Sequence, residues 1–351
     1  MSQRIYHIKR SLPELFELEQ LIQQHREHIR ISVPTHIPHK GIDLPFYCLE
    51  IGNQQPLAPT LVLIGGVHGI ERIGSQVIIA FLRTLMQRLS WDPWMHEQLA
   101  QVRLLILPIV NPAGMWNNSR ANPNGVDLMR NAPVDAIERP AFLVGGQRIS
   151  RHLPWYRGKK DTPMEVEAQV LIETVLQQVG NQPHVISLDC HSGFGSRDRV
   201  WFPYAKTTTP WPAIGKGLAL TSLFESTYPN HKVYLFEPQA HSYTTHGDIW
   251  DHVYDLYQQD NPNGHYLPLT LEMGSWLWVK KNPRHIFSYS SLFNPILPHR
   301  HARIMRRHLT LFEFLMSAVR SMPSWLNDDK SNFDTLYYAA LNRWYPDIDN
   351  Q

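Results

Sequence analysis

Four short apolar runs, each ending at a glycine or a polar residue, constrain the fold of this chain more than any other feature. The runs are Thr60 to Ile64, Val102 to Val110, Val185 to Leu188 and Tyr266 to Leu271. Continuous apolar runs of this length are typical of strands buried on both faces. Helical patterns separate them, from Glu71 to Leu89 and from Pro163 to about Val179. The alternation predicts an α/β fold in which helices cover both faces of a mixed, mostly parallel twisted sheet.

Outside this central region the pattern is weaker. Apolar residues recur at close to helical period between Leu12 and Ile29, and Pro34 and Pro38 then close that region. The segment from Asn111 to Lys160 is rich in Asn, Pro and Gly and poorly periodic, which is typical of a functional loop. Further expected elements are strands at Phe46 to Ile51 and Lys232 to Phe236, and a helix from roughly Pro298 to Ser321.

The chain has 351 residues, of which 43% are apolar, so it can bury a large core. No Gly/Ser-rich linker, charge run or repeat divides it. We therefore expect a single domain over residues 1–351, with its core at about 10–320. The C-terminal extension, 321–351, is expected to pack on the body of the domain because it is rich in aromatic residues: Trp325, Tyr337, Tyr338, Trp344 and Tyr345.

The formal net charge is +2, which gives no reason to expect nucleic acid or a membrane surface as a partner. The basic run from His299 to His308 is interpreted as a solvated helix face. Only Cys48 and Cys190 are present, which excludes a disulfide framework and favours a reducing compartment. Residues 1–14 hold no signal-peptide core and no later stretch reaches the length of a membrane span, so a cytoplasmic location is expected. The sequence leaves the oligomeric state open.

Two histidines and a glutamate follow predicted strands at positions suited to a metal ion. His68 and Glu71 lie three residues apart in the turn after the first apolar run, and His191 follows the third run in the sequence Asp-Cys-His-Ser-Gly. A catalytic zinc ion typically has three protein ligands and one water. The sequence therefore predicts one Zn²⁺ per chain, held by His68, Glu71 and His191. The structural alternative is that His191 is a hydrogen-bonded histidine at a strand end.

Two arginines and a second glutamate complete the candidate site. Arg120 and Arg130 lie in the irregular segment, where guanidinium groups suit carboxylate recognition and the stabilisation of an oxyanion. The alternative for both is a salt bridge that staples the loop. Glu272 ends the last apolar run, and a buried glutamate there either pairs with a cation or performs acid/base work beside a metal.

Taken in order, these motifs resemble those of the zinc metallocarboxypeptidases, the family of carboxypeptidases A and B and their bacterial cytoplasmic relatives. The motifs are His-x-x-Glu from His68, Asn-Pro-x-Gly from Asn111, Gly-Val-Asp-Leu-x-Arg-Asn from Gly125, Asp-x-His-Ser-Gly from Asp189 and Thr-Leu-Glu from Thr270. The resemblance runs from the opening helix to about residue 320. It implies the zinc carboxypeptidase fold, and hydrolysis of the C-terminal peptide bond of a peptide substrate.

The resemblance also implies roles for matching residues around the three zinc ligands. Glu272 would take a proton from the zinc-activated water and pass it to the leaving amine. Arg120 would polarise the scissile carbonyl. Asp127 would orient His68 from behind. These roles stand on the resemblance, and the physical chemistry of zinc and of buried charges is consistent with each.

Substrate contacts are implied in the same way. Arg130 would grip the terminal carboxylate with Asn131 beside it, and Tyr243 would cover the substrate, with Tyr234 as the alternative tyrosine. The chain departs from the family pattern at Met129, where an asparagine normally assists carboxylate binding. Losing one hydrogen bond to a charged group typically costs about 1.5 to 3 kcal/mol. The hydrolytic centre is therefore expected to be intact while the substrate class stays open.

Three functional hypotheses follow. The leading one is a carboxypeptidase that acts on short intracellular peptides. The second is an amidase or deacylase of the same fold acting on a small amide, similar to the murein-peptide amidases or to the succinylglutamate desuccinylase and aspartoacylase branch, and Met129 favours it. The third is a pseudoenzyme that binds peptide or metal without hydrolysis, and the presence of Glu272 stands against it.

Overall fold

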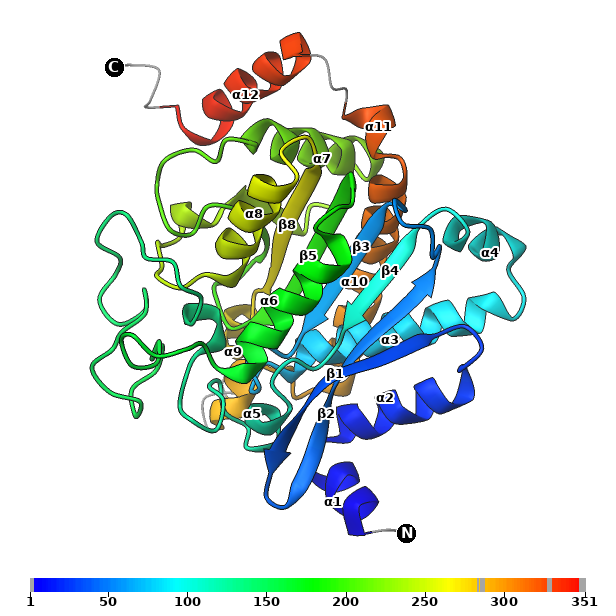
Figure 1. The fold of residues 1–351 in the computed structure, drawn as a ribbon, viewed down its shortest axis with the longest axis vertical. Helices are drawn as coiled ribbons and strands as arrows, with labels where there is room; N and C mark the ends of the chain where they lie inside the picture. The colour runs from blue at the N-terminus through cyan, green and yellow to red at the C-terminus, as the bar shows by residue number, and fades with distance from the viewer. Residues whose placement is uncertain (1–2, 283, 285–287, 327–329, 347–351) are drawn as a thin grey trace.

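A computed structural model describes residues 3–282, 284, 288–326 and 330–346 of the chain. At its centre is an eight-stranded sheet with the order β1-β2-β4-β3-β5-β8-β6-β7 (Figure 1). The strands are β1 (Arg30–His39), β2 (Ile42–Gly52), β3 (Thr60–Gly65), β4 (Arg103–Leu107), β5 (His184–Ser192), β6 (Asp198–Phe202), β7 (Tyr234–Pro238) and β8 (His265–Met273). Every residue of β3, β4 and β8 is buried, and every residue of β5 except the first. The apolar runs are therefore internal strands, as predicted.

The directions of the strands confirm a mixed, mostly parallel sheet. Four of its seven strand pairs are parallel, namely β3–β4, β3–β5, β5–β8 and β6–β7. The pairs β1–β2, β2–β4 and β6–β8 are antiparallel. Because β3, β5 and β8 are parallel neighbours, their carboxyl ends meet at one edge of the sheet.

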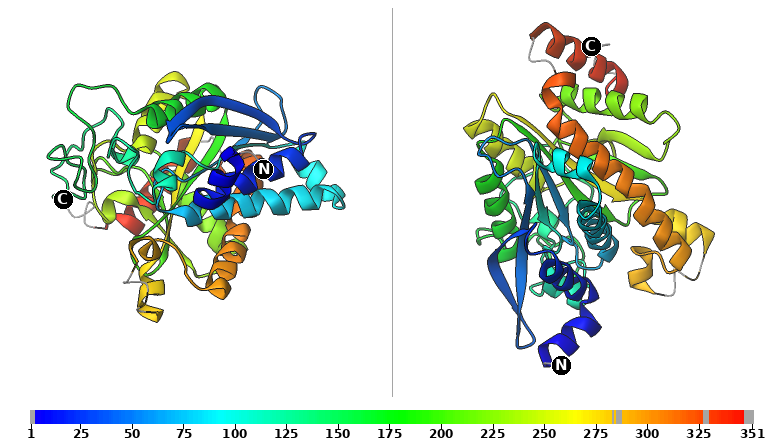
Figure 2. Two further views of the ribbon diagram at one scale, coloured as in Figure 1. Left: turned by 90° about the horizontal axis from the view of Figure 1, so that it is seen from below. Right: turned by 90° about the vertical axis from the view of Figure 1, so that its right-hand side faces the viewer.

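Helices cover both faces of the sheet, as predicted. On one face α3 (Arg72–Leu89) and α10 (Pro298–Arg320) contact β3 and β5, and Figure 2 shows α10 running along its side of the sheet. On the other face α6 (Val166–Val179) packs against α8 (Ile249–Asp260), which contacts β8. No helix among the described residues combines the length and the apolar content needed to cross a bilayer. The other helical elements are α1 (Gln3–Ser11), α2 (Pro13–Gln24), α4 (Pro93–Leu99), α5 (Pro112–Trp116), η1 (Leu128–Arg130), α7 (Ile214–Thr227), η2 (Gln239–His241), α9 (Trp276–Lys281), η4 (Tyr289–Leu292), α11 (Met322–Trp325) and α12 (Lys330–Trp344).

The N-terminal region differs from the prediction. The helix expected between Leu12 and Ile29 is present as α2, but α1 precedes it without having been predicted, and β1 occupies the region that Pro34 and Pro38 were expected to close. β1 is an edge of the sheet, and its register with β2 shifts between Ser32 and Thr35. An irregular edge strand tolerates proline because part of its backbone needs no ladder hydrogen bond. The two prolines therefore lie within regular structure.

The C-terminal extension contacts the far end of the sheet. α12 packs against α7. The indole N–H of Trp344 donates to the carbonyl of Phe236 at 3.1 Å, and the Trp344 ring lies 4.9 Å from that of Phe202. The division of the chain into one core and one extension stays a prediction.

One close approach brings α3 onto β5. Gly74, in the first turn of α3, faces Cys190, and a Cβ atom at Gly74 would lie 2.1 Å from the Cys190 carbonyl oxygen. Only glycine leaves room for backbone at this distance. Glu71 directly precedes α3 and His191 directly follows Cys190. The contact therefore sets the separation of two predicted metal ligands.

We predict that Gly74→Ala lowers the free energy of unfolding by about 1 to 3 kcal/mol, because the added methyl group overlaps the backbone of β5. Gly217→Ala is the matched control, since Gly217 also lies in a helix and its Cβ would meet Phe202 at 3.5 Å, an ordinary contact. Alanine is the better helix former, so the control should be neutral or more stable by up to about 1 kcal/mol. Urea unfolding measures both, and equal destabilisation would contradict the role of Gly74.

Candidate metal centre and catalytic pocket

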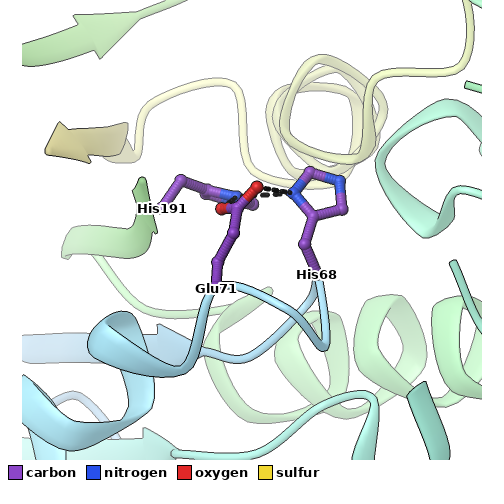
Figure 3. A group of neighbouring side chains, drawn as sticks. All are labelled: His68, Glu71 and His191. Atoms are coloured by element: carbon purple, nitrogen blue, oxygen red, sulfur yellow. Dashed lines mark hydrogen bonds and ion pairs between the residues drawn. The ribbon is translucent and has the colours of Figure 1, made fainter. Parts of the chain in front are cut away.

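Two adjacent parallel strands deliver the three predicted metal ligands to one place. The turn that joins β3 to α3 carries His68 and Glu71. β5 pairs with β3 and carries His191 one residue before its end. All three residues are buried, and their ligand atoms lie within 4.8 Å of one another (Figure 3). The structure therefore brings together residues that are up to 123 positions apart in the chain.

Hydrogen bonds fix which ring nitrogen of each histidine faces this centre. The Nδ1 atoms of His68 and His191 lie 3.1 Å apart, and Glu71 offers one carboxylate oxygen to each at 3.0 and 3.1 Å. On the far side, Nε2 of His68 lies 2.9 Å from Asp127 Oδ1 and Nε2 of His191 lies 2.7 Å from Asp189 Oδ2. A ring that donates Nε2–H to a carboxylate presents the Nδ1 lone pair to the centre.

This donor set fits a zinc ion. Two imidazole nitrogens and one carboxylate are a common ligand set of catalytic zinc sites, which keep a further position for water. In the metal-free protein a hydrogen bond joins the two Nδ1 atoms at 3.1 Å, and a bound metal ion would replace the proton held there. His68, Glu71 and His191 are therefore the residues that would hold the metal.

Asp127 lies behind His68, where the resemblance placed it, and Asp189 has the same relation to His191. Asp189 was not predicted as a site residue. Its Oδ2 also accepts the indole N–H of Trp250 at 2.9 Å, which anchors the carboxylate from α8. Asp189 lies two residues before His191 in β5, and residues at that spacing share a face of a strand. That spacing is the signal that identifies it.

Neighbouring positive charge keeps two of these carboxylates ionised. Burial alone would raise the pKa of Glu71, but His68 and His191 outweigh it and hold the pKa below its usual value. For Asp127, Arg120 and His68 likewise outweigh burial and hold the pKa well below its usual range. Arg120 joins both carboxylates, with Nη1 2.9 Å from Glu71 Oε1 and Nε 2.9 Å from Asp127 Oδ2.

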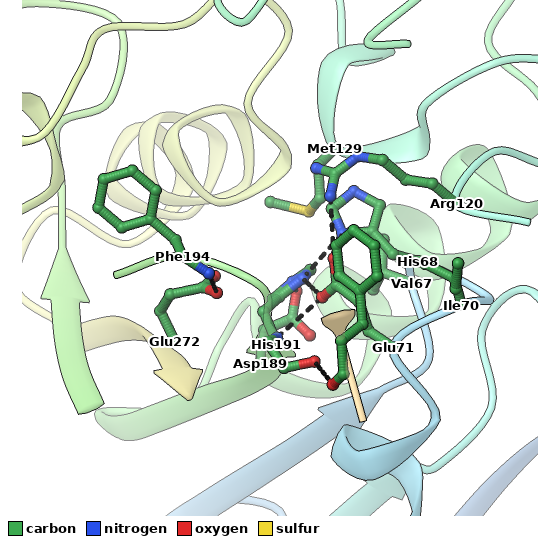
Figure 4. A network of polar contacts seen from close by, with 12 residues as sticks. Val67, His68, Ile70, Glu71, Arg120, Met129, Asp189, His191, Phe194 and Glu272 are labelled. Atoms are coloured by element: carbon green, nitrogen blue, oxygen red, sulfur yellow. Dashed lines mark hydrogen bonds and ion pairs between the residues drawn. The ribbon is translucent and has the colours of Figure 1, made fainter. Parts of the chain in front are cut away.

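Glu272 lies beside the three metal-ligand candidates, but its carboxylate is held by a backbone group. It is the register partner of His191 across β5 and β8, so the two side chains start from neighbouring strands at the same level. The Glu272 carboxylate accepts the backbone N–H of Phe194 at 2.9 Å (Figure 4). Burial, followed by the charge of Glu71, raises the pKa of Glu272 to about 8. A carboxyl group with a pKa near neutrality is suited to proton transfer at physiological pH.

These residues open onto one cavity of about 210 Å³. Arg120, Arg130 and Glu272 line it together with the three ligands. The rest of the lining is mostly apolar or aromatic and includes Met129, Val144, Pro154, Trp155, Phe194, Trp201, Tyr243, Tyr289 and Phe293.

A family model described as zinc carboxypeptidase matches residues 42–282, which is 241 of the 351 residues. The chain belongs to the zinc carboxypeptidase family. The resemblance stated from the sequence motifs is thereby confirmed.

Relatives of this zinc carboxypeptidase-family protein agree with the assignment. Carboxypeptidase E of Caenorhabditis elegans is 30% identical over 156 residues, which cover 40% of this chain and 32% of that protein. The chain thus matches about a third of the length of that relative. The structure of thrombin activatable fibrinolysis inhibitor shares 18% identity and a TM-score of 0.63, over 87% of this chain and 72% of the other. Carboxypeptidase A from Helicoverpa armigera shares 15% identity and a TM-score of 0.60, over 87% and 71%. These structures show the same fold.

In this zinc carboxypeptidase-family protein, Tyr243 and not Tyr234 lies at the cavity. The guanidinium carbon of Arg130 is 5.8 Å from the centre of the Tyr243 ring. The Tyr234 hydroxyl bonds instead to Nδ1 of His308 at 2.8 Å in a buried position. Arg130 and Tyr243 are therefore neighbours in the lining of the cavity.

Asn131 does not line the cavity, in contrast to its expected place at the substrate. Its Nδ2 donates to the carbonyl of Arg157 at 2.9 Å, and its Oδ1 accepts the backbone N–H of Glu165 at 2.7 Å. Both ends of the amide are thus used within the protein. Asn131 ties the loop to the start of α6, and its neighbour Arg130 alone of the pair reaches the cavity.

We predict that Glu272→Gln stabilises the metal-free protein at alkaline pH. In the native state the Glu272 carboxyl, with a pKa of about 8, stays protonated at pH values at which the unfolded chain, with the ordinary value of 4.5, is ionised. Native stability therefore falls as the pH rises from about 4.5 to 8, and the loss is complete above pH 8. Glutamine does not titrate and avoids this loss.

Urea unfolding in the presence of a chelator, at pH 5 and pH 8.5, tests this prediction. The stability advantage of Glu272→Gln over the wild type should be larger at pH 8.5 by roughly 1 kcal/mol or more. Glu97→Gln, at an exposed position, is the control and should show no such change with pH. An advantage that is the same at both pH values would contradict a raised pKa at Glu272.

Proposed function

We propose that this protein is a zinc-dependent carboxypeptidase that hydrolyses the C-terminal peptide bond of peptides. The observation that carries the proposal is the place of Glu272, beside His68, Glu71 and His191 and in a cavity that two arginines also line. Hydrolysis of a terminal peptide bond needs a base for water, positive charge at the scissile carbonyl and a group that recognises the chain end. Each of these has a counterpart in the cavity.

The proton transfers are assigned to Glu272. Zinc at the three ligands would supply a Lewis acid that makes water more acidic and polarises the scissile carbonyl. Glu272 accepts the proton of the attacking water and delivers it to the leaving amine. One carboxyl group can do both because its pKa is raised toward neutrality by burial and by Glu71.

Arg120 is assigned to the oxyanion. Its bonds to Glu71 and Asp127 fix the guanidinium before any substrate arrives. A preorganised charge of this kind needs no rearrangement as the tetrahedral oxyanion develops, and removing one such donor commonly costs about 3 to 4 kcal/mol of transition-state stabilisation. Arg120 therefore both supports the metal ligand Glu71 and faces the reacting group.

Arg130 is assigned to the terminal carboxylate. The side chain is nearly buried, and its hydrogen bonds go to the carbonyls of Val144 at 3.4 Å and Met129 at 3.3 Å. Among the described residues, no carboxylate forms a salt bridge with it. A buried guanidinium without a carboxylate partner is costly unless a ligand supplies one. A free C-terminal carboxylate is such a ligand.

The cavity wall favours an apolar or aromatic side chain at the substrate C-terminus. The rings of Phe194, Trp201 and Tyr243 form a cluster with centres 5.5 to 6.0 Å apart. Trp201 pairs in register with Thr270, two residues before Glu272 on β8, so the cluster stands next to the base. Burying an apolar side chain against such rings is favourable, whereas a charged one would lose its hydration.

Met129 favours the second candidate function, an amidase or deacylase that acts on a small amide. It lines the cavity at the position at which the family pattern has asparagine. A thioether cannot donate a hydrogen bond, so a substrate carboxylate would depend on Arg130 for charge-assisted binding. A substrate that places no carboxylate beside Met129 would lose less binding free energy from the absence of the asparagine.

The setting of the reaction is also a proposal. We assign one zinc ion to each chain and a peptide or a small amide as substrate, with no nucleic acid or membrane partner. A reducing, cytoplasmic location is consistent with Cys48 and Cys190, which are both buried free thiols.

We predict that Glu272→Gln lowers kcat by about 100- to 10,000-fold, because general acid–base catalysis is lost while the metal ligands are untouched. Zinc content, measured by atomic absorption, should stay at one ion per chain. Glu97→Gln serves as the surface control and should keep wild-type turnover. Unchanged turnover in Glu272→Gln would remove Glu272 from the mechanism.

We also predict that kcat/KM is at least about 10-fold higher for peptides ending in Phe or Leu with a free carboxylate than for the same peptides ending in Lys or Asp. A C-terminal amide should reduce cleavage to a similar extent, and Arg130→Ala should raise KM and erase the difference between carboxylate and amide. A substrate panel with N-acyl amino acids and murein tripeptide included measures this. Faster turnover of those compounds than of any peptide would favour the amidase or deacylase.

A further inference from the structure

The segment Phe293–Asn294, here named the 293–294 clip, touches both segments that carry the metal-ligand candidates, the turn before α3 and the end of β5. It follows η4 and lies outside residues 42–282, the part matched by the family model. It is 222 residues from Glu71 and 102 residues from His191 along the chain. The clip is thus distant in sequence from both metal-ligand candidates, yet it contacts residues directly beside them.

The side-chain amide of Asn294 brackets Glu71. Its Nδ2 donates to the carbonyl of Ile70 at 2.8 Å, and its Oδ1 accepts the backbone N–H of Ile73 at 3.0 Å. Nδ2 also donates to the carbonyl of Ser290 at 2.9 Å, which holds the amide in this orientation. An amide carries its donor and its acceptor on separate atoms of one rigid group, so asparagine matches the two sides of the turn.

The bond to Ile73 replaces a helix cap. Glu71 is the N-cap residue of α3, and the first backbone N–H groups of a helix have no partner within the helix. An N-cap side chain normally accepts one of these bonds, but Glu71 makes none because its carboxylate is directed to the metal centre. Asn294 supplies the missing acceptor from a distant part of the chain.

The neighbouring residue, Phe293, contacts the end of β5, the strand that carries His191. The hydroxyl of Ser192 donates to the carbonyl of Phe293 at 2.8 Å, and the backbone N–H of Ser192 donates to Glu71 Oε2 at 2.9 Å. A Cβ atom at Gly193 would lie 2.7 Å from the Phe293 ring, so the ring packs directly on the residue that follows β5. The clip therefore holds the two halves of the site against each other.

We propose that Asn294 is a positioning residue that caps α3 in place of Glu71 and so leaves the Glu71 carboxylate available to the metal. This inference rests on the metal centre of the proposed function. Without Asn294, the first N–H groups of α3 are left without an acceptor, and they attract the Glu71 carboxylate away from the metal. The turn that carries Glu71 also loses its hydrogen bonds at Ile70 and Ile73. The expected result is weaker metal binding rather than a change in the chemistry of the bound substrate.

Zinc affinity of Asn294→Ala, measured by competition with a chromophoric chelator, tests the proposal. We expect it to fall about 10- to 100-fold relative to the wild type, the range typical when residues that orient metal ligands are removed. Asp92→Ala is the matched control, because Asp92 caps α4 by accepting the Trp94 N–H at 3.1 Å and does not line the cavity. The control should lower the melting temperature without changing zinc affinity.

Asn294→Asp provides a second variant, which keeps the acceptor for Ile73 and loses the donor to Ile70. Its zinc affinity should lie between those of the wild type and Asn294→Ala, and it serves the test if the alanine variant does not fold. A zinc affinity within twofold of the wild type in both variants would overturn the role of Asn294 and leave the metal centre standing. A wild type that binds no zinc would overturn the metal centre itself, and this inference with it.

Discussion

The parallel register of β3, β5 and β8 is the constraint on which the rest of the structure depends. It aligns the ends of three buried strands, so that the turn after β3, His191 on β5 and Glu272 on β8 meet at one edge. The close contact of Gly74 with Cys190 then fixes the distance between α3 and β5. Because all three strands are buried along nearly their whole length, the site is held by the core and not by its own loops.

Burying so many ionisable groups in one place is costly, and the structure offsets most of the cost by pairing. Asp127 and Asp189 each hold a histidine, and Arg120 joins Asp127 to Glu71. Glu272 is the exception, since its carboxylate accepts a hydrogen bond from a neutral group, the backbone N–H of Phe194. A group that the fold leaves poorly compensated is where acid/base function is expected, because its two protonation states are close in free energy.

How much the sequence predicts depends on how locally a feature is encoded. His68, Glu71 and His191 follow apolar runs at short spacing, so both their strands and their meeting point could be inferred. Two elements lack a clear hydrophobic period. The short strand β6 mixes charged and aromatic residues, and α7 is apolar on more than one side because α12 covers it. The direction of Asn131 has no sequence signal either, because it directly follows a 3₁₀ turn, where adjacent residues point in different directions. Asn294 has no sequence signal, since a bond across 224 residues is defined only by the fold.

The prolines of β1 have a consequence for how the molecule meets its neighbours. β1 is an outer border of the sheet, and Pro34 and Pro38 each remove a backbone donor there, while the shift in register near Ser32 breaks the regular spacing of those that remain. A strand from another molecule that approached this border would find an incomplete template. The irregularity that made β1 hard to recognise thus protects the sheet from edge-to-edge aggregation.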